Sequence, residues 1–256
     1  MDLGHINKAM PIDDSHPIVS IPTSNISLWR YMDIPSFLSL LINQSLVFVR
    51  ADLFEDKYEG ILPKMTAAMI DRHIRKPQNY SKLLNESRIE TYLNCWCNES
   101  HEVVHMWKIY SKEKGVAIKT DYEALKSSIL STETIYPTLV RYIDFENEIV
   151  DWKSSGLTVY TLKRREYKSE KEFRLILPFP RLVMDQLLTM GDPTEHQRLK
   201  VKLFLDTDVI SCRVNIDTLI KHIHVSPYAP KWYKPLISGL ASKYGLQGVP
   251  VSQSDL

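Results

Sequence analysis

The sequence YKSEKEFRLILP occupies residues 167–178 and runs from charged residues into apolar ones. Its apolar half, Phe173 to Leu177, is β-rich and is closed by Pro178 and Pro180, which cannot donate to a sheet ladder. The pattern predicts a strand centred on 173–177. Because side chains alternate along a strand, Glu170, Glu172 and Arg174 are expected to share one face.

Two readings of this charged face stay open. Carboxylates two residues apart on a strand lie roughly 6–7 Å apart, given a rise of about 3.3 Å per residue. Such a pair can divide labour, so that Glu172 stabilises developing positive charge and Glu170 accepts a proton. The alternative is a solvent-facing charged strand on which Arg174 pairs with its neighbours, because surface ion pairs are common and weak.

Outward from this segment, strands and helices follow one another without regular alternation. The order favours an α+β fold. We expect an extended lead-in over residues 1–26 and one α+β domain over 27–256, with helical insertions near 60–92 and 181–206. Expected strands cover 28–31, 46–49, 92–97, 115–119, 139–143, 173–177, 223–225 and 249–251. Expected helices cover 34–43, 102–110, 121–130, 184–202 and 230–244, and another ends at 162–165.

Composition sets the broad class. The 256 residues are 44% hydrophobic and 25% charged, with a formal charge of +1, so nothing favours non-specific binding to nucleic acid or an anionic membrane. We find no apolar run long enough to span a membrane and no apolar core of an export signal. An odd number of cysteines, Cys95, Cys97 and Cys212, indicates reduced thiols and a cytoplasmic location.

Two further clusters are candidate metal sites. Asp52, Asp56 and Glu59 lie in an acidic loop after a predicted buried strand, where hard cations are conceivable, but the spacing matches no calcium loop. Cys95 and Cys97 precede two histidines at 101 and 105, but structural zinc sites space their cysteines further apart. A turn and a buried thiol are the simpler readings, and no metal is expected.

Other features point to no known nucleotide motif. Trp29-Arg30-Tyr31 places a cation between two aromatic residues on the first strand, and His222 and His224 share a strand face that we expect to be exposed. No Walker-type loop, Gly-x-Gly-x-x-Gly or Gly-x-Ser-x-Gly motif occurs.

As a set, several segments from about residue 28 to the C-terminus resemble the bacterial family known as domain of unknown function 2971. The family carries no assigned activity. The segments are 28–33 (LWRYMD), 50–60 (RADLFEDKYEG), 94–96 (NCW), 106–110 (MWKIY), 115–118 (GVAI), 140–144 (VRYID), 163–164 (KR) with 170–174 (EKEFR), and 225–230 (VSPYAP).

The layout is also similar, more weakly, to ADP-ribosyltransferase-type domains, which bind NAD in the cleft of a split sheet. This resemblance implies an α+β fold with a split, mixed or antiparallel sheet flanked by helices. This resemblance implies that Arg30 binds an NAD phosphate or ribose and that Glu172 stabilises the oxocarbenium-like transition state. It implies that Glu170 orients or deprotonates the acceptor, and that Tyr31 or Trp96 stacks on nicotinamide. Further candidate cofactor contacts are Lys163, Arg164 and Arg174. The family's Ser-Thr-Ser motif has no clear counterpart here.

Three functions follow as expectations. The first is an enzyme that uses NAD as substrate, by mono-ADP-ribosyl transfer or glycohydrolysis, with a protein, nucleic acid or small molecule as acceptor. Such an activity suits a toxin or a phage-defence effector. The second is a non-catalytic module that binds a nucleotide or peptide, and the third is a metal-dependent nuclease or hydrolase built on Asp52, Asp56, Glu170 and Glu172.

Overall fold

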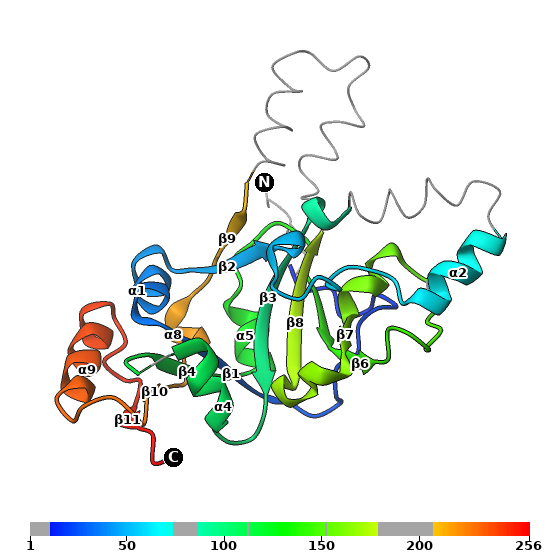
Figure 1. The fold of residues 1–256 in the computed structure, drawn as a ribbon. Helices are drawn as coiled ribbons and strands as arrows, with labels where there is room; N and C mark the ends of the chain where they lie inside the picture. Colours follow the sequence, from blue (N-terminus) through cyan, green and yellow to red (C-terminus); the bar gives the residue numbers. More distant parts are fainter. Residues whose placement is uncertain (1–10, 74–86, 112, 152, 179–206) are drawn as a thin grey trace, which may run out of the picture.

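The fold is organised around strand β3 (Thr91–Asn98), which is buried along most of its length. The computed structural model describes residues 11–73, 87–111, 113–151, 153–178 and 207–256. One edge of β3 pairs antiparallel with β8 (Glu172–Pro178) from Cys97–Glu172 to Thr91–Pro178. Its other edge pairs with two different strands, so β3 joins three parts of one sheet (Figure 1).

The main sheet of the described residues runs β11-β10-β4-β1-β3-β2-β9, and β8 and β5 branch from β3. It is mostly antiparallel, with β10 and β11 parallel. A separate parallel pair, β6 and β7, lies beside it. The remaining strands are β1 (Ser27–Met32), β2 (Ser45–Arg50), β4 (Val116–Asp121), β5 (Tyr136–Leu139), β6 (Arg141–Ile143), β7 (Leu162–Arg164), β9 (Val209–Arg213), β10 (His222–Val225) and β11 (Val251–Gln253).

Strands β1 and β2 share the second edge of β3 and leave a split between them. β1 pairs with β3 only at Leu28–Asn98 and Trp29–Cys97. β2 pairs with β3 only at Val49–Leu93 and Arg50–Tyr92. Residues 94–96 therefore pair with no described strand on this edge, and β1 and β2 diverge on either side of them.

Helix α1 (Ile34–Asn43) connects the two diverging strands. Asp33 caps it by accepting a hydrogen bond from the Ser36 backbone N–H (3.0 Å), and Pro35 occupies the first turn, where its missing N–H costs nothing. The helix buries Phe37 and a pair of leucines against the sheet and ends at Gln44, whose φ of 45° is left-handed. These boundaries confirm the helix expected over 34–43.

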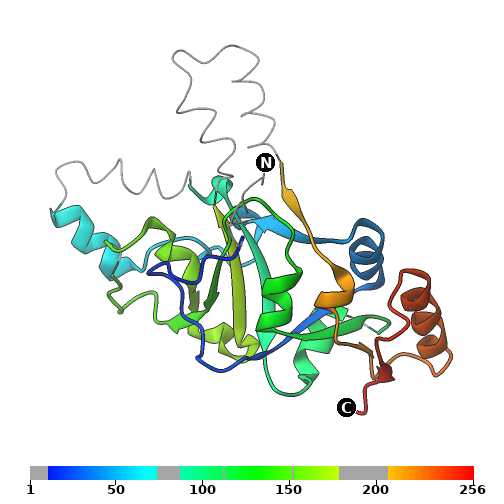
Figure 2. The ribbon, with the colours of Figure 1, turned by 180° about the vertical axis from the view of Figure 1, so that it is seen from behind.

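The other helical elements cover the two faces of the sheet unequally. Figure 2 shows α5 on the face turned away in Figure 1, where Tyr122 packs edge-on against Phe173 of β8. The opposite face carries β6, β7 and short 3₁₀ segments, and it holds the buried ion pairs of Glu172 and Arg174. The elements are η1 (Ala51–Leu53), α2 (Lys64–His73), η2 (Arg88–Glu90), α4 (Val104–Met106), η3 (Trp107–Ser111), α5 (Tyr122–Ser128), η4 (Gly156–Thr161), η5 (Arg165–Glu170), α8 (Ile216–Leu219) and α9 (Tyr233–Lys243).

The described part of the lead-in, residues 11–26, is tied to the sheet. Ile12 forms a parallel bridge with Ile135 and is buried, and Ile18 is buried as well. The Thr138 hydroxyl donates to the Ile18 carbonyl (3.0 Å). The described part of the lead-in therefore contributes to the core. No helix of the described residues has the length and apolar character needed to cross a membrane.

Several predicted elements need correction. Residues 162–164 form strand β7 rather than the end of a helix, since Leu162 pairs with Arg141 of β6. Residues 139–143 do not make one strand, because β5 ends at Leu139 and β6 begins at Arg141. The helix expected over 102–110 is shorter, comprising α4 and a π-helical turn, η3.

Other boundaries shift, and several short elements were missed. Helix α9 begins three residues after Pro230, and the last strand is displaced to Val251–Gln253. The missed elements include β9 and α8, whose short sequences carry little periodicity. Gly245 has a φ of +91°, as the predicted left-handed cap requires. The helical insertion near 181–206 and residues 74–86 lie outside the described residues.

His222 and His224 are not exposed, contrary to the prediction. Their rings stack at 4.1 Å, and the His224 ring also lies 4.8 Å from the Trp29 ring. His224 Nδ1 lies 2.8 Å from Glu102 Oε1, and the two side chains are 12% and 16% exposed. The Glu102 carboxylate and the Trp29 ring cover His224, and His222 stacks on His224.

Candidate functional site

The candidate site begins at the β3–β8 pair. Glu172 lies opposite Cys97 and Arg174 lies opposite Cys95, so these side chains share one face of the sheet. The predicted alternation of Glu172 and Arg174 onto a common face is confirmed, because Arg174 Nε donates to Glu172 Oε1 at 2.5 Å. The face lies on the side of the sheet that β7 covers.

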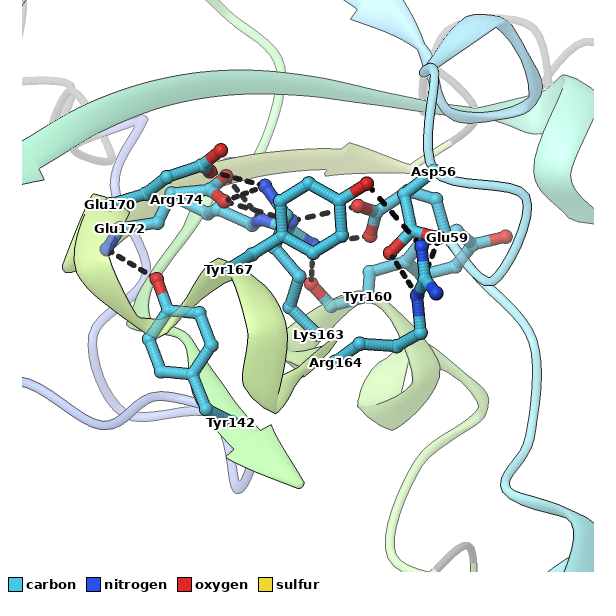
Figure 3. Close-up of polar contacts among 10 residues, drawn as sticks. All are labelled: Asp56, Glu59, Tyr142, Tyr160, Lys163, Arg164, Tyr167, Glu170, Glu172 and Arg174. Atoms are coloured by element: carbon cyan, nitrogen blue, oxygen red, sulfur yellow. Dashed lines mark hydrogen bonds and ion pairs between the residues drawn. The ribbon is translucent and has the colours of Figure 1, made fainter. Parts of the chain in front are cut away.

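Five charged side chains form a continuous ion-pair chain on this face (Figure 3). Arg174 binds Glu59 on one side, at 2.5 and 2.8 Å, and Glu172 on the other. Lys163 Nζ then bridges Glu172 Oε2 at 2.9 Å and Glu170 Oε2 at 2.5 Å. Three carboxylates therefore share two cations, and Glu170 is the terminal carboxylate.

Glu170 reaches this chain by a route that differs from the prediction. It is the last residue of the 3₁₀ segment η5, not a residue of the strand. Lys171 follows with a left-handed φ of 43°, which reverses the backbone before β8 begins at Glu172. Because of this turn, the alternation of side chains along a strand does not apply to Glu170. The Glu170 carboxylate is linked to Glu172 through Lys163, which binds both.

The solvent-facing reading of this segment is wrong. Arg174 is 0% exposed, Glu172 5% and Glu170 9%. Because unpaired charges are costly away from water, each of these groups requires its partner. A network of this kind is a poor source of net stability but fixes its members in position, and removing one partner leaves an uncompensated charge.

A cavity of about 240 Å³ opens above the network, at the split of the sheet. Arg30 of β1 and Glu172 of β8 both line it, so the residue pair on which the predicted site depends is brought to one cavity. The other predicted site residues that line it are Tyr31, Trp96, Lys163 and Glu170. The Arg30 guanidinium carbon lies 5.7 Å from the centre of the Trp96 ring.

The charges of the cavity are set by burial and by the ion pairs. Burial alone would raise the pKa of Glu172, but Arg174 and Lys163 outweigh it and lower that pKa, so the carboxylate is ionised. Burial would lower the pKa of Lys163, but Glu172 and Glu170 raise it, so Lys163 is a cation. Burial lowers the pKa of Arg30 to about 10, which still leaves it charged at neutral pH.

Other predicted residues lie away from the cavity lining. Arg174 sits within the network, where Nη1 also donates to the Tyr160 carbonyl at 2.8 Å. Arg164 pairs with Asp56 at 3.0 Å, and Asp52 pairs with Arg50 at 2.7 Å. The acidic loop thus supplies partners to basic residues, and Glu59 is its link to the network. In the described part of the chain, no three His, Cys, Asp or Glu side chains form a group that would hold a metal ion.

The lining also contains Tyr110, which was not predicted as a site residue, and Cys95, which was considered only as a metal ligand. Burial, followed by the nearby Glu172 charge, raises the pKa of the Cys95 thiol, and this thiol donates to Glu172. Tyr110 is placed by the π-helical turn η3, an irregularity often found at functional sites. Neither the cysteine pair nor the residues of the π-helical turn show in the sequence that they line a cavity with Glu172, because that depends on the folded structure.

Tyr142 was also missed, and it fixes the start of β8. Its hydroxyl accepts a hydrogen bond from the Glu172 backbone N–H at 2.8 Å.

Comparisons with family models, with curated proteins and with solved structures give no match. The chemistry of the site is therefore argued from its geometry: an ionised carboxylate, a second carboxylate, an arginine and aromatic rings around one small cavity.

Proposed function

We propose that this chain cleaves NAD at the nicotinamide–ribose bond, as an enzyme of the ADP-ribosyltransferase type. The supporting observation is that Arg30, Glu170 and Glu172 line one cavity at a split in the sheet. The weak resemblance to ADP-ribosyltransferase domains assigns the phosphate contact and the two carboxylates to the same three residues. Transfer to an acceptor and hydrolysis by water share the bond-breaking step.

In the proposed reaction the bond between ribose C1′ and the nicotinamide ring nitrogen breaks, and its electron pair neutralises the pyridinium. The ribose is left as an oxocarbenium ion, whose positive charge the ionised Glu172 carboxylate stabilises. Water or an acceptor hydroxyl adds to C1′, and its proton passes to Glu170. Both carboxylates are held in position by Lys163, at 2.9 and 2.5 Å.

The first test is nicotinamide release from NAD by the purified protein in the presence of EDTA, which removes metal-dependent chemistry. Glu172→Gln should abolish release, and Glu170→Gln should lower it by about 10²–10⁴-fold as expected for loss of a general base. A thermal melt of each variant separates loss of the fold from loss of activity. Release by Glu172→Gln at the wild-type rate, from a folded protein, would refute the assignment.

One observation favours a second candidate, a non-catalytic nucleotide-binding module. The oxygens of Glu172 accept hydrogen bonds from Arg174, Lys163 and Cys95, which together occupy the roughly four acceptor positions of a carboxylate. A ribose hydroxyl would have to displace Lys163 or the thiol to reach it. Binding of NAD without nicotinamide release would establish this second function.

A further inference from the structure

A second cavity, of about 470 Å³, adjoins the first at the same split of the sheet. Both cavities are lined by Arg30, Tyr31, Val49 and Tyr110. The second lies between the diverging strands β1 and β2 and the first turns of α1. The split therefore holds two adjoining cavities, and Arg30 stands at the boundary between them.

Arg30 is a cation without a counterion at this boundary. Its Nη1 atom is buried and has no hydrogen-bond partner among the residues that the structure describes. No carboxylate in the described part of the chain pairs with it, in contrast to Arg174 and Lys163. Buried polar groups are nearly always satisfied, so an orphaned guanidinium nitrogen indicates a missing anionic partner. A planar guanidinium suits a phosphate in particular.

The two cavities differ in their walls. The first carries the aromatic rings of Trp29 and Trp96 beside the carboxylates, and neither ring lines the second cavity. The second carries the hydroxyl-bearing residues Ser36, Ser39 and Ser45, which suit a sugar. The first cavity alone is smaller than the about 300–1,000 Å³ typical of sites for drug-sized ligands, and the second one extends it into that range.

We infer that the two cavities form one two-lobed site for a dinucleotide, whose pyrophosphate binds Arg30 and whose second nucleoside occupies the lobe beside α1. This inference rests on the proposed function only for the assignment of nicotinamide to the first lobe. It adds that the second lobe contributes binding energy and that a mononucleotide fills only half of the site.

The test measures binding by calorimetry, so that it does not depend on turnover. The probes are a carbocyclic NAD analogue that cannot be cleaved and nicotinamide mononucleotide. Ser39→Phe fills the second lobe, and Ile42→Phe, on the same helix but 60% exposed and outside both linings, is its matched control. Arg30→Met removes the guanidinium, and because Arg30 makes no ion pair with any described residue, this variant should fold.

The expected result is that Ser39→Phe lowers the affinity for the NAD analogue by about ten-fold or more, because the space for one nucleoside is lost. The affinity for the mononucleotide should stay unchanged. Arg30→Met should lower the affinity for both probes, because both carry a phosphate. Equal affinity of Ser39→Phe and Ile42→Phe for the analogue, or no binding of the analogue to the wild type, would overturn the two-lobed site. Two-lobed binding without nicotinamide release would instead overturn only the proposed activity.

Discussion

Glu59 and Arg174, 115 positions apart in the chain, form a bidentate ion pair that excludes water. Nη1 lies 2.5 Å from Oε1 and Nη2 lies 2.8 Å from Oε2, and both side chains are 0% exposed. Glu59 comes from the acidic loop and Arg174 from the centre of β8. The pair thus joins the loop to the floor of the candidate site.

Glu59→Gln should destabilise the protein by about 3–5 kcal/mol, because it leaves part of a buried guanidinium charge uncompensated. Urea denaturation followed by circular dichroism measures the change. The matched control is Glu146→Gln, which removes a surface ion pair with Lys64, where the carboxylate is 53% exposed, and should leave the midpoint unchanged. Equal midpoints for the two variants would contradict the burial of the pair.

The three thiols should be unreactive in the folded protein. Burial raises the pKa of Cys95 and of Cys212, and it raises that of Cys97 to about 12. Because the thiolate is the nucleophile, iodoacetamide at pH 8 should label none of them in native protein and all of them in urea. Mass spectrometry of the labelled peptides provides the readout. Rapid native labelling of Cys95 would show that the thiol in the cavity is ionised.

Stability should fall as the pH drops below about 6.5, because of His222. Burial first, then His224 and Lys119, lowers the pKa of His222 from its value of 6.5 in an unfolded chain. The unfolded state therefore binds the proton more readily, so this contribution is complete above pH 6.5 and is lost on acidification, although Glu102 partly opposes the shift. The pKa of Glu172 is also lowered, from 4.5, so the stability that this carboxylate contributes is lost only below pH 4.5.

The measurement for this prediction is the thermal midpoint between pH 8 and pH 5. His222→Gln has no proton to gain and should show a flatter profile in this window. A wild-type profile as flat as that of the variant would contradict the assignment. The separation of the two pH windows keeps the histidine effect distinct from that of the carboxylates.

Prediction of the fold from sequence succeeded where one pattern determined one element. Helix α1 has a capping Asp33, Pro35 in its first turn and apolar residues at helical spacing, and its boundaries were correct. Residues 162–164 were misassigned because three residues show no periodicity, and only pairing with β6 makes them a strand. Short elements of this kind are determined by tertiary contacts, which local sequence does not contain.

Part of the geometry of the candidate site was predictable for the same reason. Glu172 and Arg174 share a face because strand geometry requires it. Their burial could not be read from their charges, since it depends on Glu59 and Lys163 arriving from distant segments. The orphaned Nη1 of Arg30 was equally inaccessible, because a missing partner is a property of the folded structure.

Lys163→Met should change the pH dependence of NAD cleavage, if the proposed function holds. Without this cation, Glu170 and Glu172 lose their shared partner, and the protonated form of one of them becomes favoured. The acid limb of the pH–rate profile should therefore move towards neutral pH. Lys171→Met, which removes an exposed lysine paired with Glu99, should leave the profile in place. An unchanged profile for Lys163→Met would show that Lys163 does not control the carboxylates.

Gly115→Ala should be strongly destabilising, because the backbone leaves no room for a β-carbon between η3 and β1. A Cβ at this position would lie 2.4 Å from the Ser111 carbonyl oxygen and 2.5 Å from the Met32 carbonyl oxygen. Backbone atoms cannot turn away as a flexible side chain does, so β1 and η3 would have to separate. Overpacking of this kind costs typically about 1–3 kcal/mol, and occasionally more.

The matched control is Gly156→Ala, where an added Cβ meets nothing within 4 Å and the stability should be unchanged or slightly higher. Thermal melts of both variants give the comparison. Separation of η3 from β1 would also displace Tyr110, which lines both cavities. At temperatures where the Gly115→Ala variant remains folded, its affinity for the NAD analogue should therefore be lower than that of the wild type. A folded Gly115→Ala variant with wild-type stability and affinity would mean that the close contact between η3 and β1 does not shape the site.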